Sequence, residues 1–220
     1  MAISERPGGD RMATFARVRA TDDPATPTAR HAHLLDVVYV TDQPSLSLAA
    51  TQFAWDSDVQ ADRLYSRERL EEWLELAGLP ALSTTTSEGQ LQQLRELRES
   101  VYRLARQRIS GETPDPEHVA VVNAAAALPT AAPRLSAGGF ERDAAAEGFA
   151  FPGLLSLLAR NAIDVVAGPW SDRLRACERT PCTHMFVDRS PGGVRRWCTG
   201  AKCGNRVRAA EFRQRNGRAA

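Results

Sequence analysis

The sequence predicts an α+β protein, in which a mostly helical N-terminal domain with a small β-sheet is followed by a small cysteine-rich module. Helical periodicity dominates residues 67–167, short β-prone runs precede it, and all four cysteines lie within 27 positions near the C-terminus. The 220 residues, of which 43% are hydrophobic, are enough for one medium-sized domain and a small appendage. No apolar run reaches the 18 residues that a membrane span requires, so we expect a soluble protein without a membrane partner.

The chain divides into three expected segments, at residues 1–30, 31–168 and 171–216. The first segment is rich in Pro, Gly, Thr, Asp and Arg and lacks periodic hydrophobicity, so we expect a flexible leader that has no signal-peptide core. The second segment is the expected α+β domain, and the third is the cysteine-rich module. Two β-prone runs, at residues 34–40 and 45–53, open the α+β domain on either side of a break at Gln43-Pro44.

Apolar residues at three- and four-residue spacing predict four helices, at residues 67–77, 88–109, 116–128 and 153–167. Ser66 and Gly78 are the expected ends of the first helix. Ser87 and Gln90 have the spacing of a capping box for the second helix, and Asp115 is the expected N-cap of the third. The last helix is continuously apolar, so we expect it to be the core helix on which the others pack.

The charged residues of this domain predict a solvated surface rather than a catalytic site. Those on the second helix are expected to form local ion pairs in water: Glu88, Arg95, Glu96, Arg98, Glu99, Arg103 and Arg106. Four aspartates without a basic or nucleophilic companion are expected to be turn and surface residues: Asp36, Asp56, Asp58 and Asp62. Residues 134–142 are a candidate hairpin. Because the chain also lacks a phosphate-binding loop and hydrolase motifs, we expect a protein that is not an enzyme.

The cysteines form two pairs with the same spacing, Cys177-x4-Cys182 and Cys198-x4-Cys203, separated by fifteen residues. Each pair can fold into a tight turn that points two sulfurs inward, so two facing turns make a closed four-sulfur site. Such a site favours Zn²⁺, with iron as a softer alternative, and leaves no open position for a substrate. The competing interpretations are two disulfides, which a reducing cytoplasm disfavours, and free buried thiols. The module is therefore predicted to be a small four-cysteine zinc finger of treble-clef or ribbon type.

The spacer between the pairs is predicted to be a β-hairpin, with strands at residues 184–188 and 194–197 on either side of a Pro-Gly-Gly turn. Phe186 and Trp197 are expected to cover the metal site, whereas His184 is expected to be a surface residue and not a ligand. A zinc ion with four thiolates carries a net charge of about −2. The cations expected to stabilise it are Arg175, Arg179, Arg195, Arg196, Lys202 and Arg206.

This pattern is similar to the CGNR zinc-finger family, a resemblance carried by the four cysteines and by Phe186, Asp188, Ser190, Arg195-Arg196-Trp197 and Gly204-Asn205-Arg206. The Leu-x-x-Trp-Leu helix that ends in Gly-Leu at residues 65–79 resembles the ABATE domain that precedes the finger in that family. The resemblance implies a stress-responsive bacterial transcriptional regulator with four zinc-binding cysteines and a finger that binds nucleic acid. Residues 48–52 depart from the family, since they read Leu-Ala-Ala-Thr-Gln where members carry Val-Asn-Thr.

Charge divides the chain at the same boundary. Residues 171–220 hold twelve Lys or Arg and four Asp or Glu, a net charge of +8, which leaves 16 basic and 23 acidic residues, a net charge of −7, in residues 1–170. A basic module of this kind suits a polyanion. The helix expected after Cys203 carries arginines on two opposite sides and therefore has no single basic stripe. The candidate nucleic-acid contacts are Arg195, Arg196, Lys202, Arg206, Arg208, Arg213 and Arg215.

We therefore expect a cytoplasmic, zinc-dependent, DNA-binding regulator whose N-terminal domain senses a small-molecule effector or forms a homodimer. RNA is the less favoured nucleic acid, because the finger has few aromatic side chains on which bases can stack. The alternative is a protein-interaction module, in which the finger clamps a partner or its own acidic domain. The two hypotheses differ in salt dependence, because phosphate binding weakens steeply as ionic strength rises.

Overall fold

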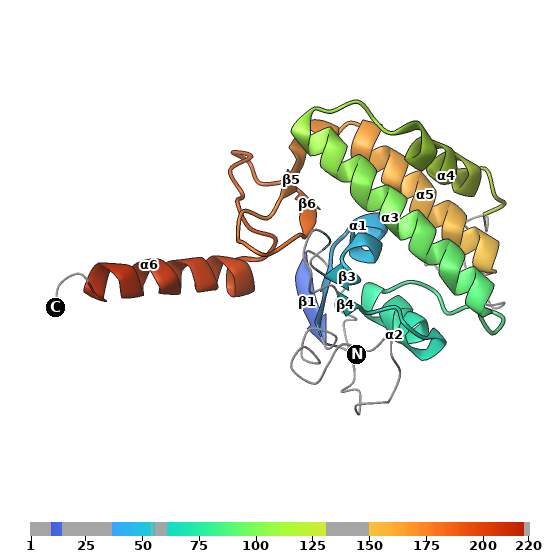
Figure 1. Cartoon of the computed structure of the whole chain (residues 1–220), viewed down its shortest axis with the longest axis horizontal. Helices are drawn as coiled ribbons and strands as arrows, with labels where there is room; N and C mark the ends of the chain where they lie inside the picture. Colours follow the sequence, from blue (N-terminus) through green and yellow to red (C-terminus); the bar gives the residue numbers. More distant parts are fainter. Residues whose placement is uncertain (1–9, 15–36, 54, 56–60, 131–149, 218–220) are drawn as a thin grey trace, which may run out of the picture.

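The computed structural model describes residues 10–14, 37–53, 55, 61–130 and 150–217, and it shows a helical body from which one helix projects (Figure 1). The body is built on three helices that pack against one another, α3 (Glu88–Ser110), α4 (Pro116–Ala126) and α5 (Phe151–Ala167). Leu94 on α3 and Leu154 and Leu158 on α5 are fully buried between them. The apolar α5 also contacts the first helix of the chain, and it is the core helix that the sequence predicts.

Local signals at three helix ends act as predicted, whereas Ser66, which precedes residues 67–77, makes no side-chain capping hydrogen bond. At the start of α3 the Ser87 hydroxyl accepts a hydrogen bond from the Gln90 backbone (3.2 Å), and the Gln90 side chain accepts one from the Ser87 backbone (2.9 Å). The Asp115 carboxylate caps α4 by accepting a hydrogen bond from the backbone two residues further on. Helix α2 (Arg67–Ala77) ends at Gly78, whose φ of 68° is in the left-handed region that favours glycine.

The strand predicted at residues 45–53 is wrong for most of its length, because this run begins with a helix, α1 (Pro44–Ala49). The Asn161 side chain of α5 accepts hydrogen bonds from both the backbone and the hydroxyl of Ser45, which fixes the start of the helix. Helix α1 is buried against α3 and α5. Packing on a distant part of the chain therefore overrides the β-propensity of this segment.

Two small antiparallel sheets lie beside the helices. Strand β1 (Arg11–Thr14) pairs with β2 (Val37–Val40), and β3 (Gln52–Phe53) pairs with β4 (Ala61–Asp62). Strand β2 confirms the predicted strand at residues 34–40 over the part that the structure describes. Strand β1 lies inside the segment for which we predicted a flexible leader, and its pairing with β2 gives these four residues an ordered structure that composition alone did not reveal.

The charged face of α3 is not a solvated surface throughout, because Arg98 is buried. Its guanidinium forms a bidentate ion pair with Asp62 of β4, with N···O distances of 2.6 and 2.8 Å, and donates to the Thr51 hydroxyl. Arg95 lies 3.5 Å from the same carboxylate. The expectation that Arg98 and Asp62 are independent surface residues is therefore wrong. Their pair joins α3 to the second sheet.

The zinc-finger module is docked on the helical body. Strand β5 (Leu174–Ala176) pairs with β6 (Met185–Val187), so the predicted hairpin between residues 184–188 and 194–197 is wrong in its second strand. Because β6 pairs with β5, it lies against the helical body, where all three of its side chains are buried. The buried core of the body includes Leu174 of β5 and both Met185 and Val187 of β6.

Helix α6 (Asn205–Gly217) extends away from the body (Figure 1). It continues directly from a π-helical turn, η3 (Gly200–Gly204), and its main tertiary contacts are with that turn. The helix predicted to follow the last cysteine is confirmed. The candidate hairpin at residues 134–142 lies outside the described part of the chain. Among the described residues, no helix combines the length and the apolar character needed to cross a membrane.

Candidate metal centre

The four cysteine side chains lie together where the zinc-finger module contacts the helical body. Cys177 follows β5 and Cys182 precedes β6, whereas Cys198 precedes the turn η3 and Cys203 lies within it, just before α6. All four Sγ atoms lie within 4.8 Å of one another, with 3.4 Å between Cys198 and Cys203 and 3.9 Å between Cys182 and Cys198. A tetrahedral zinc ion with Zn–S bonds of about 2.3 Å places its sulfurs about 3.8 Å apart. The cluster fits a four-sulfur zinc site, and all four cysteines are free thiols rather than disulfide partners.

The electrostatics of the cluster favour thiolates at two of the four positions. Hydrogen bonding with Cys182 lowers the pKa of Cys177 to about 7, and hydrogen bonding with Cys177 raises the pKa of both Cys182 and Cys198. Hydrogen bonds with Cys177 and the other thiols lower the pKa of Cys203, as does Arg179, whose Nε lies 3.1 Å from Cys203 Sγ. A divalent cation binds thiolates and displaces the remaining protons.

A cation from the helical body also lies close to the cysteines. Arg63 is 2% exposed and donates to the Ala50 carbonyl at 2.9 Å, and Ala50 belongs to the same buried cluster as the cysteines. Burial and the nearby Arg69 lower the pKa of Arg63 to about 9, against the opposing effects of Asp62 and Cys182. The helical body therefore supplies positive charge to the metal centre. Sequence reasoning had placed such cations in the finger alone.

The apolar cover of the cysteines also comes from both parts of the molecule. Phe186 is fully buried and Trp197 is half-buried against the cluster, which confirms the two predicted cover residues. Tyr39 of β2 is buried in the same cluster, and Met12 of β1 packs against it. The first sheet therefore closes one side of the metal centre.

His184 is a core residue, which corrects the prediction that it lies on the surface. It is 5% exposed, and its ring stacks on Tyr39 with 5.0 Å between the centroids and 11° between the planes. Burial, with a contribution from Arg63, lowers the pKa of His184 to about 3, so the imidazole is neutral. Its ring nitrogens have no hydrogen-bond partner among the described residues, and the sulfur cluster does not include it. The prediction that His184 is not a ligand agrees with this geometry.

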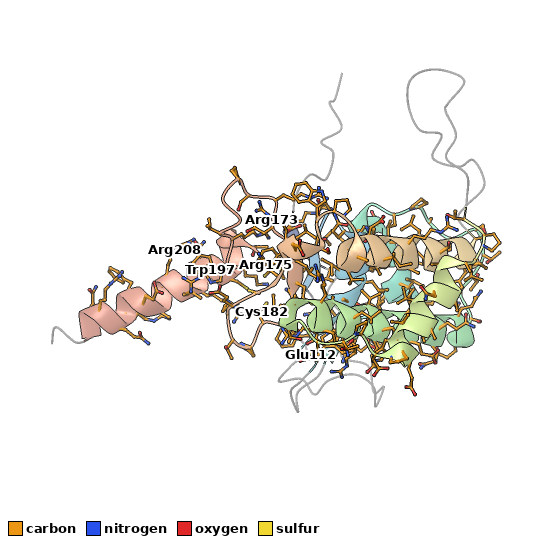
Figure 2. All side chains as sticks on the ribbon, turned by 90° about the horizontal axis from the view of Figure 1, so that it is seen from above. Glu112, Arg173, Arg175, Cys182, Trp197 and Arg208 are labelled. Atoms are coloured by element: carbon orange, nitrogen blue, oxygen red, sulfur yellow. The ribbon has the colours of Figure 1, made fainter. Side chains whose placement is uncertain are left out.

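The run from Gly204 to Arg206 gives the second cysteine pair its connection to α6. A Cβ atom at Gly204 would lie 3.2 Å from both Trp197 and Arg208, so any larger residue would force these side chains to move by a few tenths of an ångström. The Asn205 side chain donates to the carbonyl of Ala201 at 2.8 Å and accepts from Arg208 at 2.5 Å. Figure 2 shows Trp197 and Arg208 together where α6 leaves the finger. Asn205 therefore has a structural role here.

Arg195, one of the predicted nucleic-acid contacts, is bound within the protein. Its guanidinium pairs with Asp10 at 2.6 Å, donates to the Tyr39 hydroxyl at 3.3 Å and to the carbonyls of Trp197 and Cys198, and lies over the Phe186 ring. Asp10 also accepts a hydrogen bond from Tyr39 at 2.7 Å. The charge of Arg195 is thus used to hold the first sheet against the finger.

The other predicted contacts differ in how accessible their charges are. Arg196 is exposed but pairs with Glu178 at 2.6 Å, and Lys202 is half-buried. Arg208 is exposed, although it binds Asn205 and lies over Trp197. Three arginines on α6 are exposed and have no ion-pair partner within the described residues: Arg206, Arg213 and Arg215.

The fold and the site together define a protein with a helical α+β body and a four-cysteine zinc finger docked on it. Residues 42–169, more than half of the chain, match the ABATE family, described as "Putative stress-induced transcription regulator", and residues 173–216 match the CGNR zinc finger. The chain belongs to the ABATE family and carries a CGNR zinc finger after the ABATE domain. A comparison with curated proteins finds no match. The cofactor that the four cysteines are positioned to coordinate is Zn²⁺.

Sequence reasoning missed the residues of the N-terminal part that complete the metal centre. Met12, Tyr39, Ala50 and Arg63 lie more than 110 residues before the first cysteine, and no spacing rule connects them to it. Tyr39 was recognised only as part of a strand, and Arg63 follows one of the aspartates that we interpreted as surface residues. A long-range contact of this kind leaves no local signal in a single sequence.

Proposed function

We propose that this protein is a zinc-dependent DNA-binding regulator that presents α6 to duplex DNA. The observation that carries the proposal is α6 itself, an exposed basic helix that projects from a zinc-stabilised turn and has no packing partner along most of its length in the described structure. Exposed arginines without an ion-pair partner among the described residues, such as Arg206, Arg213 and Arg215, suit phosphate groups. Four cysteines kept as free thiols also suit the reducing cytoplasm in which such a regulator acts.

The arrangement of arginines on α6 suits a helix lying in the major groove. At 100° per residue, Arg206 and Arg213 lie on one side, and Arg208 and Arg215 lie on the opposite side. The major groove is about 12 Å wide, which admits a helix and leaves a phosphate backbone on each flank. Two opposite arginine rows can therefore contact both backbones at once. Phe212, 58% exposed, lies between the rows and offers an apolar contact to a thymine methyl group.

The test is binding of the full-length, zinc-loaded protein to fragmented genomic DNA at two salt concentrations, followed by sequencing of the bound fragments. We expect particular fragments to be enriched, with an affinity that falls steeply with salt. The triple variant Arg206→Gln, Arg213→Gln, Arg215→Gln should reduce the slope of log K against log salt by about one for each lost phosphate contact. Arg103→Gln, Arg106→Gln, Arg160→Gln is the matched control, because it removes the same charge from the helical body.

A protein-interaction role is the second candidate, and one observation favours it. Part of the finger's charge is already bound inside the protein, since Arg195 pairs with Asp10 and Arg189 pairs with Asp42 at 2.6 Å each. These two ion pairs use part of the finger's charge within the protein, whereas the exposed arginines of α6 stay accessible to an external partner. If the wild-type protein enriches no DNA at either salt concentration, this second role is favoured. Equal enrichment of single-stranded RNA would assign α6 to RNA instead.

The proposed role is binding and not catalysis. Four sulfurs complete the coordination of a zinc ion and leave no position for an activated water. A zinc ion in this site would hold the two cysteine turns and η3 together, and α6 begins where η3 ends. Zinc thereby fixes the direction in which α6 leaves the body.

A further inference from the structure

A cavity lies on the helical body, where the C-terminal end of α3 meets α4 and the C-terminal end of α5. Its volume is about 340 Å³, within the range of small-molecule pockets. Apolar side chains from all three helices form its walls, among them Leu104, Val119, Val122, Ile163 and Val166. The walls are mostly apolar, so they offer few hydrogen-bond partners to an ordered water.

The rim of the cavity carries one positive charge, on Arg108. Its guanidinium donates to the Ser171 hydroxyl at 3.2 Å and pairs with the Asp172 carboxylate. The two paired side chains are 40% and 88% exposed, and ion pairs as exposed as this contribute little stability. A guanidinium has five N–H donors, so Arg108 can bind a further carboxylate beside Asp172 or in its place.

We propose that this cavity binds a small apolar monocarboxylic acid, with the carboxylate on Arg108 and the hydrocarbon part between α3, α4 and α5. The volume corresponds to roughly ten non-hydrogen atoms, taking about 30 Å³ for each. Glu112 on the same rim disfavours a second negative charge on the ligand. A medium-chain alkanoic acid or a phenylalkanoic acid meets both conditions.

The distribution of apolar surface favours a small ligand over a protein partner. Among the described residues of the three helices, Val121 of α4 is the exposed large apolar side chain, and it does not line the cavity. On these three helices the apolar surface is therefore concentrated inside the hollow, and the exposed Trp170 beyond α5 is a single side chain. A protein interface would need a contiguous apolar patch spread over the face around it.

A ligand bound at Arg108 would act on the finger through the short segment that joins α5 to β5. Ser171 and Asp172 belong to η2 (Ser171–Arg173), the single turn between α5 and strand β5 of the finger. A carboxylate that draws Arg108 away from Asp172 weakens the link between α3 and this turn. The binding site itself does not depend on the proposed DNA-binding role, so the two proposals can fail separately.

The test is calorimetric titration of the full-length, zinc-loaded protein with octanoate and 4-phenylbutyrate, and with 1-octanol as the uncharged control. We expect one-site binding of at least one acid and at least tenfold weaker binding of octanol. Arg108→Gln should weaken binding of that acid at least tenfold. Arg106→Gln, a matched change on the exposed face of the same helix, should leave it unchanged. Hydrogen exchange in the complex should slow at residues 104–112 and 163–167.

The proposal is overturned if neither acid binds in a saturable way in the millimolar range, where weak sites are still measurable. It is also overturned if octanol binds as tightly as octanoate, or if Arg108→Gln and Arg106→Gln behave alike. Ile163→Phe fills the cavity and should abolish binding of the acid. Because Arg108 is at the rim and half-exposed, the Arg108→Gln comparison holds even if Ile163→Phe fails to fold.

Discussion

At the scale of single residues, Arg63 shows how the helical body contributes to the zinc centre. A buried guanidinium is costly unless charge compensates it, and a zinc ion with four thiolates is an anionic partner of about −2. Arg63 lies against Ala50, in the cluster that contains the cysteines, and Cys182 raises its pKa against the effect of burial. Its charge and that of the metal centre therefore stabilise each other.

We predict that Arg63→Met weakens zinc binding by about 10-fold, the lower end of the range for groups outside the coordination sphere, because Arg63 acts on Cys182 through its charge. Arg63→Lys keeps the charge and should retain most of the affinity. Competition between the protein and a chromogenic chelator measures both. Equal losses of zinc affinity in the two variants would show that Arg63 acts through its packing. Arg106→Met, on the exposed face of α3, is the control for the loss of one positive charge elsewhere.

The pair between Arg98 and Asp62 is a second prediction at this scale. Asp62→Asn leaves the Arg98 guanidinium, 4% exposed, without its counter-ion, so we expect the free energy of unfolding at pH 7 to fall by about 3 kcal/mol. Urea unfolding measures the change. Asp164→Asn, an exposed carboxylate on α5, is the matched control and should change stability by less than about 0.5 kcal/mol.

The difference in unfolding free energy between wild type and Asp62→Asn should depend on pH, and the lowered pKa of Asp62 gives the direction. Although burial alone would raise the pKa of Asp62, the hydrogen bonds and charge of Arg98 lower it below the ordinary value of 3.8. A carboxyl group with a lowered pKa in the folded state stabilises the fold above its unfolded pKa and loses that effect as pH falls through the folded pKa. The gap between wild type and Asp62→Asn should therefore narrow below about pH 4. Both proteins lose zinc in acid, and comparing them removes that shared effect. A gap that widened in acid would contradict the ion pair.

At the scale of elements, α6 differs from every other long helix described here, because it has almost no tertiary packing. An isolated helix of this length is marginally stable in water, so we predict that its amide protons exchange far faster than those of α3. Ala209→Gly in α6 should leave the melting temperature unchanged. Ala159→Gly in the buried α5 should lower it by roughly 2–4 °C for each kcal/mol lost. A matching drop for Ala209→Gly would show that α6 packs on the body in solution.

The elements that the sequence predicted well are those with signals at their own ends. Helix α3 begins at the capping box of Ser87 and Gln90, and α2 ends at Gly78, so each boundary depends on neighbouring residues alone. Helix α1 and strand β1 were missed because each is fixed by a distant partner, Asn161 for one and β2 for the other. Propensity and periodicity carry no information about such contacts.

In the candidate site, too, the residues that the sequence predicted are those with a local signal, and those it missed depend on distant contacts. The zinc ligands were predictable because the pairing and spacing of four cysteines is itself the geometric requirement of the metal. The role of Arg195 was not predictable, since nothing in its sequence neighbourhood shows that Asp10 and Tyr39 would engage its charge. The arginines of α6 remain predicted contacts, and their exposure is compatible with that role.

At the scale of the whole molecule, the charge division between residues 1–170 and 171–220 led us to expect two modules with separate partners. The structure shows one continuous packing unit that includes the strands of the finger. Leu174 and Val187 belong to the core of the helical body, and Tyr39 belongs to the cluster around the cysteines. The opposite charges of the two parts meet in the ion pair of Arg195 with Asp10 and in that of Arg189 with Asp42.

Because each part of the molecule completes the core of the other, loss of zinc should destabilise both. We predict that Cys198→Ser, which removes a buried ligand, lowers the melting temperature of the full chain by at least about 10 °C. Amide exchange should also accelerate in β2, the strand that carries Tyr39, and at the C-terminal end of α3, which contacts β5. Wild-type protein treated with a zinc chelator should reproduce both effects, whereas Ser190→Ala in the same module should not. If the finger unfolded while exchange in β2 and α3 stayed unchanged, the two parts would be independent. Zinc would then orient α6 alone, without stabilising the body on which the finger rests.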